Sequence, residues 1–281
     1  MQYGLYFPNF GKFGDPHVMV EIAVTAEQAG WDGVFPWDHI QVGHWAGPVM
    51  DPWVAMAAMA AATERIRLGP MVTPLPRRRP TKLARETVTL DHLSRGRLIL
   101  GVGIGWPPDV DFGNFGDAED NRVRGEQLDE GLDLLAALWS GEIVTHEGTH
   151  HTAIDARFLP TPVQEPRIPI WVGGMWPRKP AFRRAARWDG IYPMAIGDSP
   201  DDFVAMTPEM LSDIVAYVRS HRETDDPFDV AVNGSSFPGT ESGAPADFAA
   251  AGATWWIENV GWPPDVPLQR WLEFIAEGPP G

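Results

Sequence analysis

RIRLGPMVTPLPRRRPTKLARETVTLDHLSRGRLILGVGIGW, residues 65–106, joins two apolar runs through an amphipathic stretch. We predict strands at 65–73 and 97–106, because short apolar runs are typical of buried strands. Residues 80–96 between them are predicted to form a helix. A strand, a helix and a second strand in this order indicate a βαβ unit with parallel strands.

The same alternation continues through the rest of the chain in both directions. Further strands are expected at 3–10, 32–40, 169–176, 189–196, 228–236 and 254–260. Further helices are expected at 15–30, 51–63, 121–141, 180–188, 208–223, 245–252 and 267–278. Eight such units in about 250 residues predict a (β/α)8 TIM barrel, with residues 1–281 as one domain. Residues 142–164 are expected to form a loop or hairpin insertion before strand five. The main alternative is a doubly wound open sheet, which periodicity alone does not exclude.

Aspartate followed by proline begins two of the predicted helices. Asp15 is expected to cap the first of these helices, with Pro16 at the first helical position and Gly30 at the end. Asp51 and Pro52 repeat this pattern at the start of the next helix.

The chain is acidic and contains no cysteine. Its formal net charge of −16 opposes binding to nucleic acids or anionic membranes, because the summed field repels polyphosphates. The lack of cysteine excludes disulfides, thiol catalysis and cysteine metal sites. We expect a cytoplasmic protein, because the sequence shows neither a targeting segment nor an apolar run of about 18 residues.

Asp38 and His39, at the end of predicted strand two, are the best candidates for acid-base chemistry. In a TIM barrel, reactive groups gather at the carboxyl ends of the strands. An imidazole exchanges protons near neutral pH, and an adjacent carboxylate can orient it. Neighbours along a strand point to opposite faces, so these two side chains need not touch. The alternative is an aspartate that caps a helix and a histidine on the surface.

Glycines at two strand ends indicate sites where a ligand can approach the backbone. GVGIGW, residues 101–106, lacks the third glycine of a dinucleotide fingerprint, and two prolines follow, which disfavours a Rossmann nicotinamide site. Gly103 and Gly105 would instead allow a flat ring to approach closely. The amides of residues 172–174, before helix five, suit a phosphate. Tight turns between strand and helix are the alternative explanation.

Two basic groups lie beyond strands three and five. They are Arg77, Arg78, Arg79, Lys82 and Arg85, and Arg178, Lys179, Arg183, Arg184 and Arg187. Basic patches around a barrel mouth, inside an acidic shell, would select a small anion with several charges. Alternatively, the helical arginines pair with acidic side chains on neighbouring helices.

Motifs of several other enzyme classes are absent from the sequence. His146, His150 and His151 lack the helical spacing of an HExxH zinc site. No GxSxG elbow or P-loop is present, so a serine hydrolase or an NTPase has no support.

Four stretches together resemble the bacterial luciferase-like superfamily of flavin- and deazaflavin-dependent oxidoreductases. They are EQAGWDGVFPWDHI (27–40), residues 65–106 quoted above, RGEQLDEGLDLLAALWSG (124–141) and PIWVGGMWPRKPAFRRAARWDGIYP (169–193). The resemblance implies a (β/α)8 barrel, usually a homodimer, that binds FMN or coenzyme F-420 at its carboxyl-terminal mouth.

The resemblance also implies roles for individual residues. A non-prolyl cis peptide of strand three would fall at Met71-Val72, behind the central ring, and Asp38 and His39 would lie beside that ring. The arginines after strand three would be available to a phosphate or to the polyglutamate tail of F-420. The expected cofactor-binding residues are Met71, Val72, Thr73, Gly103, Ile104, Gly105, Gly173, Gly174, Met175 and Arg77, with Gly173, Gly174 and Met175 on the phosphate.

One position departs from the family pattern. Deazaflavin-dependent sugar-phosphate dehydrogenases of this family have a glutamate acid/base where this chain has Trp106, which argues against a phosphorylated sugar as substrate. Large rings supply broad apolar faces, so Phe7, Trp37, Trp106 and Trp176 are predicted to line a hydrophobic substrate pocket.

The expected function is that of an oxidoreductase. It would use coenzyme F-420, or alternatively FMN, to reduce or monooxygenate a small hydrophobic organic substrate, and His39 would exchange the proton. The alternatives are a non-catalytic flavin-binding protein and a metal-dependent barrel hydrolase.

Overall fold

Parallel strands form a closed ring in the computed structural model, which describes residues 1–199 and 202–280. The sheet runs in the order β3, β2, β1, β12, β11, β9, β8, β5 and β4. These strands are β1 (Gln2–Phe7), β2 (Gly33–Pro36), β3 (Arg67–Leu68), β4 (Thr73–Pro74), β5 (Leu100–Gly103), β8 (Ile170–Trp176), β9 (Gly190–Ile196), β11 (Asp229–Gly234) and β12 (Trp255–Asn259). The ring closes where Leu68 bridges Leu98, and the Ile99 amide donates to the Leu68 carbonyl at 2.9 Å. The predicted (β/α)8 barrel is therefore confirmed, and the open sheet is excluded.

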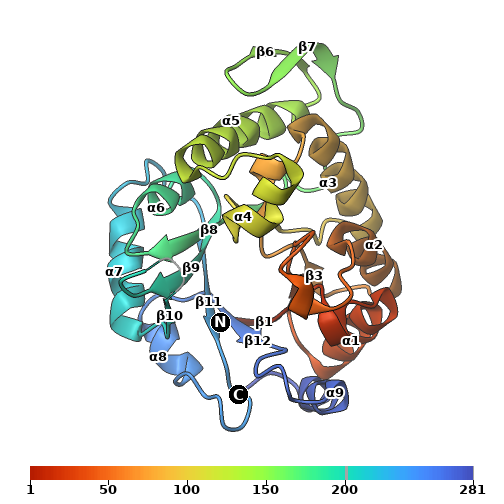
Figure 1. Cartoon of the computed structure of the whole chain (residues 1–281). Coiled ribbons are helices and arrows are strands. Elements are labelled where there is room, and N and C mark those ends of the chain that lie inside the picture. The colour runs from red at the N-terminus through yellow and green to blue at the C-terminus, as the bar shows by residue number, and fades with distance from the viewer. Residues whose placement is uncertain (200–201, 281) are drawn as a thin grey trace.

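Helices surround the ring of strands (Figure 1). They are α1 (Pro16–Ala29), α2 (Pro52–Ala62), α3 (Pro80–Ser94), α5 (Asn121–Trp139), α6 (Pro180–Ala185), α7 (Pro208–Arg219), α8 (Pro245–Ala250) and α9 (Leu268–Glu277). The alternation did not predict the short helix α4 (Pro108–Asp111), the 3-10 turns η1 (Gly11–Phe13), η2 (His44–Ala46), η3 (Leu75–Arg77) and η4 (Gly113–Phe115), or the antiparallel strand β10 (Phe203–Val204). No helix in the described part of the chain is long and apolar enough to cross a bilayer.

The Asp-Pro helix starts form as predicted. The Asp15 carboxylate accepts a hydrogen bond from the His17 amide at 2.8 Å, and Gly30 ends α1 in the left-handed conformation with φ of 90°. Asp51 accepts from the Val54 amide at 2.9 Å in the same way. Each carboxylate satisfies an amide that a helix start leaves free.

Alternate residues of the strands pack on opposite sides of the sheet. Trp255 and Ile257 of β12 belong to a cluster inside the barrel that also contains Trp171 and Tyr192. Trp256, between them in sequence, packs instead in the layer between strands and helices. Both faces of the parallel sheet are therefore buried, and the barrel interior is a packed core whose functional groups lie at its carboxyl end.

The third barrel strand is interrupted, although a continuous strand is predicted at 65–73. Residues 69–72 separate β3 from β4, and the Met71-Val72 peptide is cis, as the family resemblance implies. Gly69 lies so close to the segment that leads into β5 that an added Cβ would be 1.7 Å from the Ile99 carbonyl oxygen. The segment therefore bulges at the level where a ligand would enter the barrel.

An antiparallel hairpin, β6 (Ile143–Glu147) and β7 (Thr152–Arg157), lies between α5 and β8, outside the helices (Figure 1). Glu130 of α5 fastens it: its carboxylate accepts from His146 Nε2 at 3.0 Å and from the amides of His150 at 2.9 Å and His151 at 2.7 Å. Burial raises the pKa of Glu130, but these hydrogen bonds outweigh burial and lower the pKa to about 2.

Glu130 should therefore control how firmly the hairpin is attached. Because the folded-state pKa lies below the ordinary value of 4.5, its contribution to stability is present above pH 4.5 and is lost as the pH falls toward about 2. At pH 7, we expect Glu130→Gln to raise hydrogen exchange of the β6 and β7 amides about tenfold. Glu147→Gln, an exposed carboxylate on β6, is the control and should change little. Equal exchange in the two variants would contradict the anchoring role.

Candidate active site

The bulge before β4 places Val72 between the ends of two other strands. A Cβ added to Gly103 of β5 would lie 2.7 Å from Val72 Cγ2, and one added to Gly173 of β8 would lie 3.0 Å from Val72 Cγ1. Both glycines are therefore required to make room for the valine. Three of the predicted cofactor-binding residues, Val72, Gly103 and Gly173, are thus in contact at the carboxyl end of the barrel.

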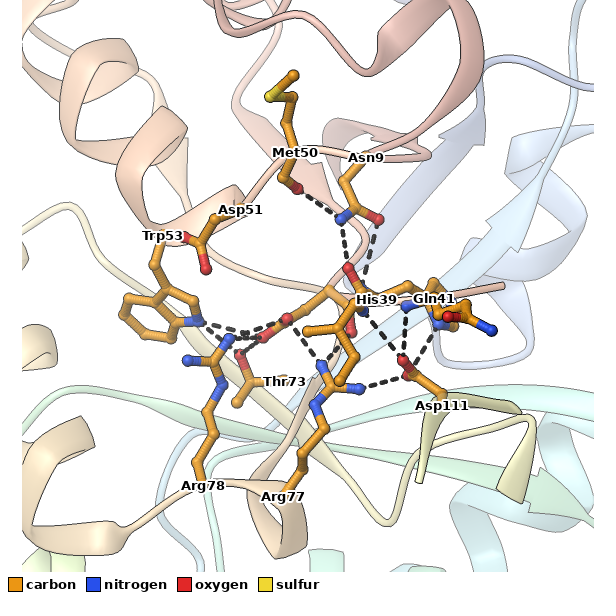
Figure 2. A network of polar contacts seen from close by, with 12 residues as sticks. Asn9, His39, Gln41, Met50, Asp51, Trp53, Thr73, Arg77, Arg78 and Asp111 are labelled. Carbon is orange, nitrogen blue, oxygen red and sulfur yellow. Dashed lines mark hydrogen bonds and ion pairs between the residues drawn. The ribbon is translucent and has the colours of Figure 1, made fainter. Parts of the chain in front are cut away.

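Asp38, just after β2, is buried and ion-paired. Its carboxylate accepts from Thr73 Oγ1 at 2.8 Å and from Trp53 Nε1 at 3.2 Å. Arg78 Nη2 donates to both of its oxygens at 2.9 Å, and Arg77 Nη2 donates at 3.2 Å. Figure 2 shows these donors converging from α2 and from the segment after the bulge. So many donors leave this carboxylate poorly placed to exchange a proton with a ligand.

His39, the next residue, contacts a different carboxylate. Its Nδ1 lies 3.2 Å from Asp111 Oδ2, and Arg77 donates to the same oxygen. Asp111 Oδ1 accepts from the amides of Ile40 and Gln41, each at 3.0 Å (Figure 2). The two sequence neighbours Asp38 and His39 therefore have separate partners. Both lie in the loop after β2, which ends at Pro36, and not in the strand predicted at 32–40.

Asn9, at the end of β1, fixes the backbone of His39. Its side-chain amide donates to the carbonyls of His39 at 2.8 Å and Met50 at 2.7 Å, and its oxygen accepts from the His39 amide at 3.3 Å. Asn9 is fully buried. Asn9 therefore holds the backbone of His39, while Asp111 contacts its ring.

Aromatic rings lead from the barrel interior to His39. The centroids of Tyr192 and Tyr6 are 5.5 Å apart, and those of Tyr6 and Trp37 are 5.0 Å apart. Trp37 in turn lies 5.9 Å from the His39 ring, which also has Phe10 at 6.4 Å. This placement beside His39 is compatible with the pocket role predicted for Trp37.

Several buried polar atoms along this row of rings have no hydrogen-bond partner within the described residues, among them the donor Trp37 Nε1 and the acceptor Asn259 Oδ1. Asn259 pairs in register with Tyr6 on β1. Burial raises the pKa of the Tyr6 phenol above its usual value, so its hydroxyl stays protonated. Unpaired polar groups are costly in a protein interior, and a ligand with both donors and acceptors would satisfy them.

Two of the predicted pocket residues face away from the mouth. Phe7 is fully buried and packs against Phe13, 6.3 Å away, in the layer between strands and helices. Trp176 packs against Phe182 at 5.2 Å, with Lys179 Nζ 3.1 Å from its ring centroid. These placements do not fit the substrate pocket expected for the two rings.

Trp106 lies on the loop after β5, where its ring meets Phe203 edge-on at 5.7 Å. Phe203 belongs to β10, which follows β9. The placement of Trp106 on a loop at the carboxyl side of the strands is compatible with the pocket role predicted for it.

The remaining predicted cofactor-binding residues have structural contacts of their own. Gly174 allows α6 to approach, because an added Cβ would lie 2.8 Å from Ala181 Cβ. Gly105 has φ of 84°, and the carbonyls of Ile104 and Gly105 accept from Arg124 at 3.1 Å and 3.0 Å. Thr73 faces Asp38. A role of these residues, of Met71 and of Met175 toward a cofactor stays a prediction.

The arginines divide into those that pair with acidic side chains and those that do not. Arg184 and Arg187 pair with Asp129 and Asp133 of α5, as the alternative explanation for the helical arginines predicts. Arg77 and Arg78 are engaged by Asp38 and Asp111. Arg79 is exposed, and no described residue forms a hydrogen bond or ion pair with its side chain, although its carbonyl accepts from the amides of Lys82 and Leu83, each at 3.0 Å. In the described chain, no group of three or more acidic or histidine side chains is arranged to hold a metal.

Asp111 is the site residue that the sequence analysis missed. It is separated from His39 by 72 positions, and no spacing rule connects the two. One signal was available: GWPPDV occurs at 105–110 and at 261–266, and the residue that follows is Asp111 in the first copy but Pro267 in the second.

Comparison with known sequences identifies one family. A family model described as luciferase-like monooxygenase matches residues 1–273. An F-420-dependent glucose-6-phosphate dehydrogenase of Microbacterium testaceum is 33% identical over 229 residues, which cover 79% of this chain and 64% of that protein. An enzyme of the same name from Beutenbergia cavernae is 36% identical over 187 residues, 61% of this chain and 50% of that protein. The chain thus matches half to just under two thirds of the length of these relatives.

Solved structures with low sequence identity share the fold. An F-420-dependent secondary alcohol dehydrogenase, in complex with an F-420-acetone adduct, superposes with a TM-score of 0.78 at 18% identity and covers 99% of this chain and 98% of that one. A monooxygenase from Streptomyces bottropensis gives a TM-score of 0.73 at 22% identity, with coverage of 98% and 96%. A type II Baeyer-Villiger monooxygenase from Pseudomonas putida, in complex with FMN, gives 0.67 at 21% identity, with coverage of 84% and 67%.

The contact between Val72 and Gly103 can be tested without any ligand. We expect Gly103→Ala to lower the free energy of unfolding by about 1–3 kcal/mol, because the new methyl group overlaps Val72. Val72→Ala in the same chain should recover most of that loss. Gly125→Ala on α5, where the nearest atom to an added Cβ lies at 3.5 Å, is the control and should not destabilise the protein. Urea unfolding measures all four proteins, and a Gly103→Ala variant as stable as the control would contradict the proposed fit.

Proposed function

The chain belongs to the luciferase-like monooxygenase family, and from this premise we propose that it is an oxidoreductase that uses coenzyme F-420 on a small organic substrate. FMN with monooxygenation is the second candidate. A bound deazaflavin or flavin would supply the hydride or oxygen chemistry, while the protein supplies orientation and electrostatics. The observation that carries the proposal is the His39 imidazole, held by Asp111 beside Trp37 at the barrel mouth.

The residues at the mouth fit a flat ring with polar edges. Trp37 Nε1 and Asn259 Oδ1 are a buried donor and a buried acceptor that lack partners in the described chain. The pyrimidine part of a flavin or deazaflavin carries both N–H donors and carbonyl acceptors. We propose that Val72 backs the ring and that Gly103 and Gly173 lie beside it, with the backbone at Gly174 and Met175 near the phosphate.

His39, rather than Asp38, is proposed as the group that exchanges a proton with the substrate. Its ring is partly exposed and forms one polar contact, whereas the Asp38 carboxylate is shared between two guanidinium groups, an indole and a hydroxyl. An imidazole also changes charge near neutral pH. Asp38 would then act by holding Arg77 and Arg78 in place.

A neutral, hydrophobic substrate suits this mouth better than a phosphorylated sugar. Arg77 and Arg78 are the first two cations in the chain after the bulge, and both are paired with carboxylates. Trp37 and Trp106 supply apolar faces instead. The proposed substrate therefore differs from the glucose 6-phosphate for which the relatives are named.

F-420 is preferred to FMN because several curated relatives are named for it and because Trp37, Asp38 and His39 match the deazaflavin-using pattern. The arginine triplet gives only weak support for F-420, because Arg77 and Arg78 form ion pairs with Asp111 and Asp38. Arg79 remains available. Together with Arg78, Lys82, Leu83 and Glu86 it lines a shallow hollow of about 250 Å³ that would suit a phosphate or a carboxylate-bearing tail.

Titration with F-420 and with FMN, followed by tryptophan fluorescence at low and high salt, tests the proposal. We expect preferential, salt-sensitive binding of F-420 that weakens about three- to tenfold in Arg79→Ala, through loss of a partly exposed charge contact. Arg219→Ala, an exposed arginine on α7, is the control. Preference for FMN would favour the monooxygenase, and binding of neither cofactor would overturn the proposal.

The protein is further proposed to act as a cytoplasmic homodimer of single-domain subunits. Helix α2 supports the dimer, because it is apolar around its whole circumference, including Val54, which is 73% exposed, and the exposed Ala58 and Ala61. A surface helix with no polar face usually packs against another chain. A second copy of this chain is the proposed occupant of that face.

Sedimentation equilibrium tests the dimer. We expect the wild-type protein to be dimeric and Val54→Arg to weaken dimerisation at least about tenfold, because a charge would be buried at the interface. Ile154→Arg is the matched control, since Ile154 is 66% exposed on the outlying strand β7. A monomeric wild-type protein, or equal effects of the two changes, would contradict an interface at α2.

A further inference from the structure

The Asp111 carboxylate is surrounded by hydrogen-bond donors. Oδ1 accepts from the backbone amides of Ile40 and Gln41, and Oδ2 accepts from Arg77 and lies 3.2 Å from His39 Nδ1. The side chain is only 1% exposed. Each of its contacts therefore acts in a region from which water is largely excluded.

This environment keeps Asp111 ionised. Burial raises the pKa of its carboxyl, but the hydrogen bond to His39 and the positive charge of Arg77 outweigh burial, so the pKa lies below its usual range. An ionised carboxylate accepts hydrogen bonds and donates none. The group facing it from His39 must therefore be an N–H.

We propose that Asp111 is the positioning residue that sets the tautomer of His39, with the hydrogen on Nδ1 and with Nε2 as the nitrogen that gains and loses the proton. Nδ1 keeps its hydrogen in both states of the ring, since its partner only accepts. That Nε2 exchanges its proton with a substrate rests on the proposed function, whereas the tautomer itself follows from the contacts of Asp111.

Asp38 cannot fill this role, although it is next to His39 in sequence. Its oxygens accept from Thr73, Trp53 and the guanidinium of Arg78. The loop after β5 provides the carboxylate instead: Trp106 occupies the position expected for a glutamate, and Asp111 follows further along the same loop, at the end of α4. The loop thus supplies an acid to His39 from a different position.

Arg77 limits the ways in which Asp111 can move. It donates to Asp111 with Nη1 and to Asp38 with Nη2, and only 6% of its side chain is exposed. A guanidinium is planar and rigid, so it fixes the distance between the two carboxylates. Asp111 is therefore held with Oδ2 toward His39.

Nitrogen-15 NMR of the imidazole groups, on the full chain without cofactor, tests the proposal directly. The His39 signal is assigned by its loss in His39→Gln. In the wild-type protein we expect the neutral ring to carry its hydrogen on Nδ1. In Asp111→Asn we expect the oxygen to keep both hydrogen bonds from the Ile40 and Gln41 amides, at the loss of the single bond from Arg77. The amide NH₂ then faces the ring and moves the hydrogen to Nε2.

Asp109→Asn is the matched control, because Asp109 is an exposed carboxylate on the same short helix. It should leave the tautomer unchanged. A merely structural Asp111 predicts the same tautomer in Asp111→Asn as in the wild type, and that result would overturn the proposal. The proposal would also be overturned by a wild-type ring with its hydrogen on Nε2, a result that does not require the variant to fold.

Turnover provides the second readout. On a substrate found by screening the F-420-loaded enzyme, we expect kcat of Asp111→Asn to fall about 10²- to 10⁴-fold while F-420 affinity stays within about twofold. An unchanged kcat would overturn the catalytic part of the proposal. If the NMR result is as expected but neither F-420 nor FMN binds the wild-type protein, the proposed function fails and the tautomer assignment stands.

Discussion

Arg77 places one positive charge between two buried carboxylates, and the geometry of the barrel mouth depends on it. Asp38 follows β2, Asp111 ends α4 after β5, and Arg77 follows the interrupted third strand. Loss of one partner from such a buried network leaves an uncompensated charge, which costs about 3–5 kcal/mol. Three loops that are far apart in the sequence are therefore fixed relative to one another, and His39 lies where they meet.

The same network explains why so acidic a chain has three consecutive arginines. The net charge is −16, yet Arg77 and Arg78 point inward and neutralise buried acids rather than attract an anion from solution. Only Arg79 of the triplet is exposed. Arg77 and Arg78 therefore stabilise the internal structure of the mouth. Of the three arginines, Arg79 is the one whose charge faces solvent.

The mouth owes its shape to backbone close packing as much as to charge. Val72 enters the barrel from the bulge, and Gly103 and Gly173 are the positions that its methyl groups require to be without side chains. Neighbouring residues in the loop after β2 have separate partners. Asp38 joins the ion pairs, while His39 meets the row of aromatic rings that begins inside the barrel. The imidazole of His39 and the ion-paired carboxylate of Asp38 are therefore adjacent in sequence but have different side-chain partners.

The main alternation of strands and helices and the Asp-Pro helix starts were determined by the sequence alone, because they depend on periodicity and on local capping. Periodicity left a closed barrel and an open sheet as alternatives, and the bridge between Leu68 and Leu98 in the tertiary structure decided for the barrel. The proton-exchanging role of His39 and the cofactor-binding role of the strand-end glycines are predictions made from the sequence and stay predictions, whereas the structure shows that Gly103 and Gly173 make room for Val72. Only the tertiary structure decided which carboxylate His39 contacts, because Asp111 lies 72 positions away and reaches it through closure of the barrel. It also decided the faces of Phe7 and Trp176, since a shift of one residue along a strand reverses the side on which a side chain lies. Local interactions define the elements, whereas contacts between loops exist only after the ring of strands has closed.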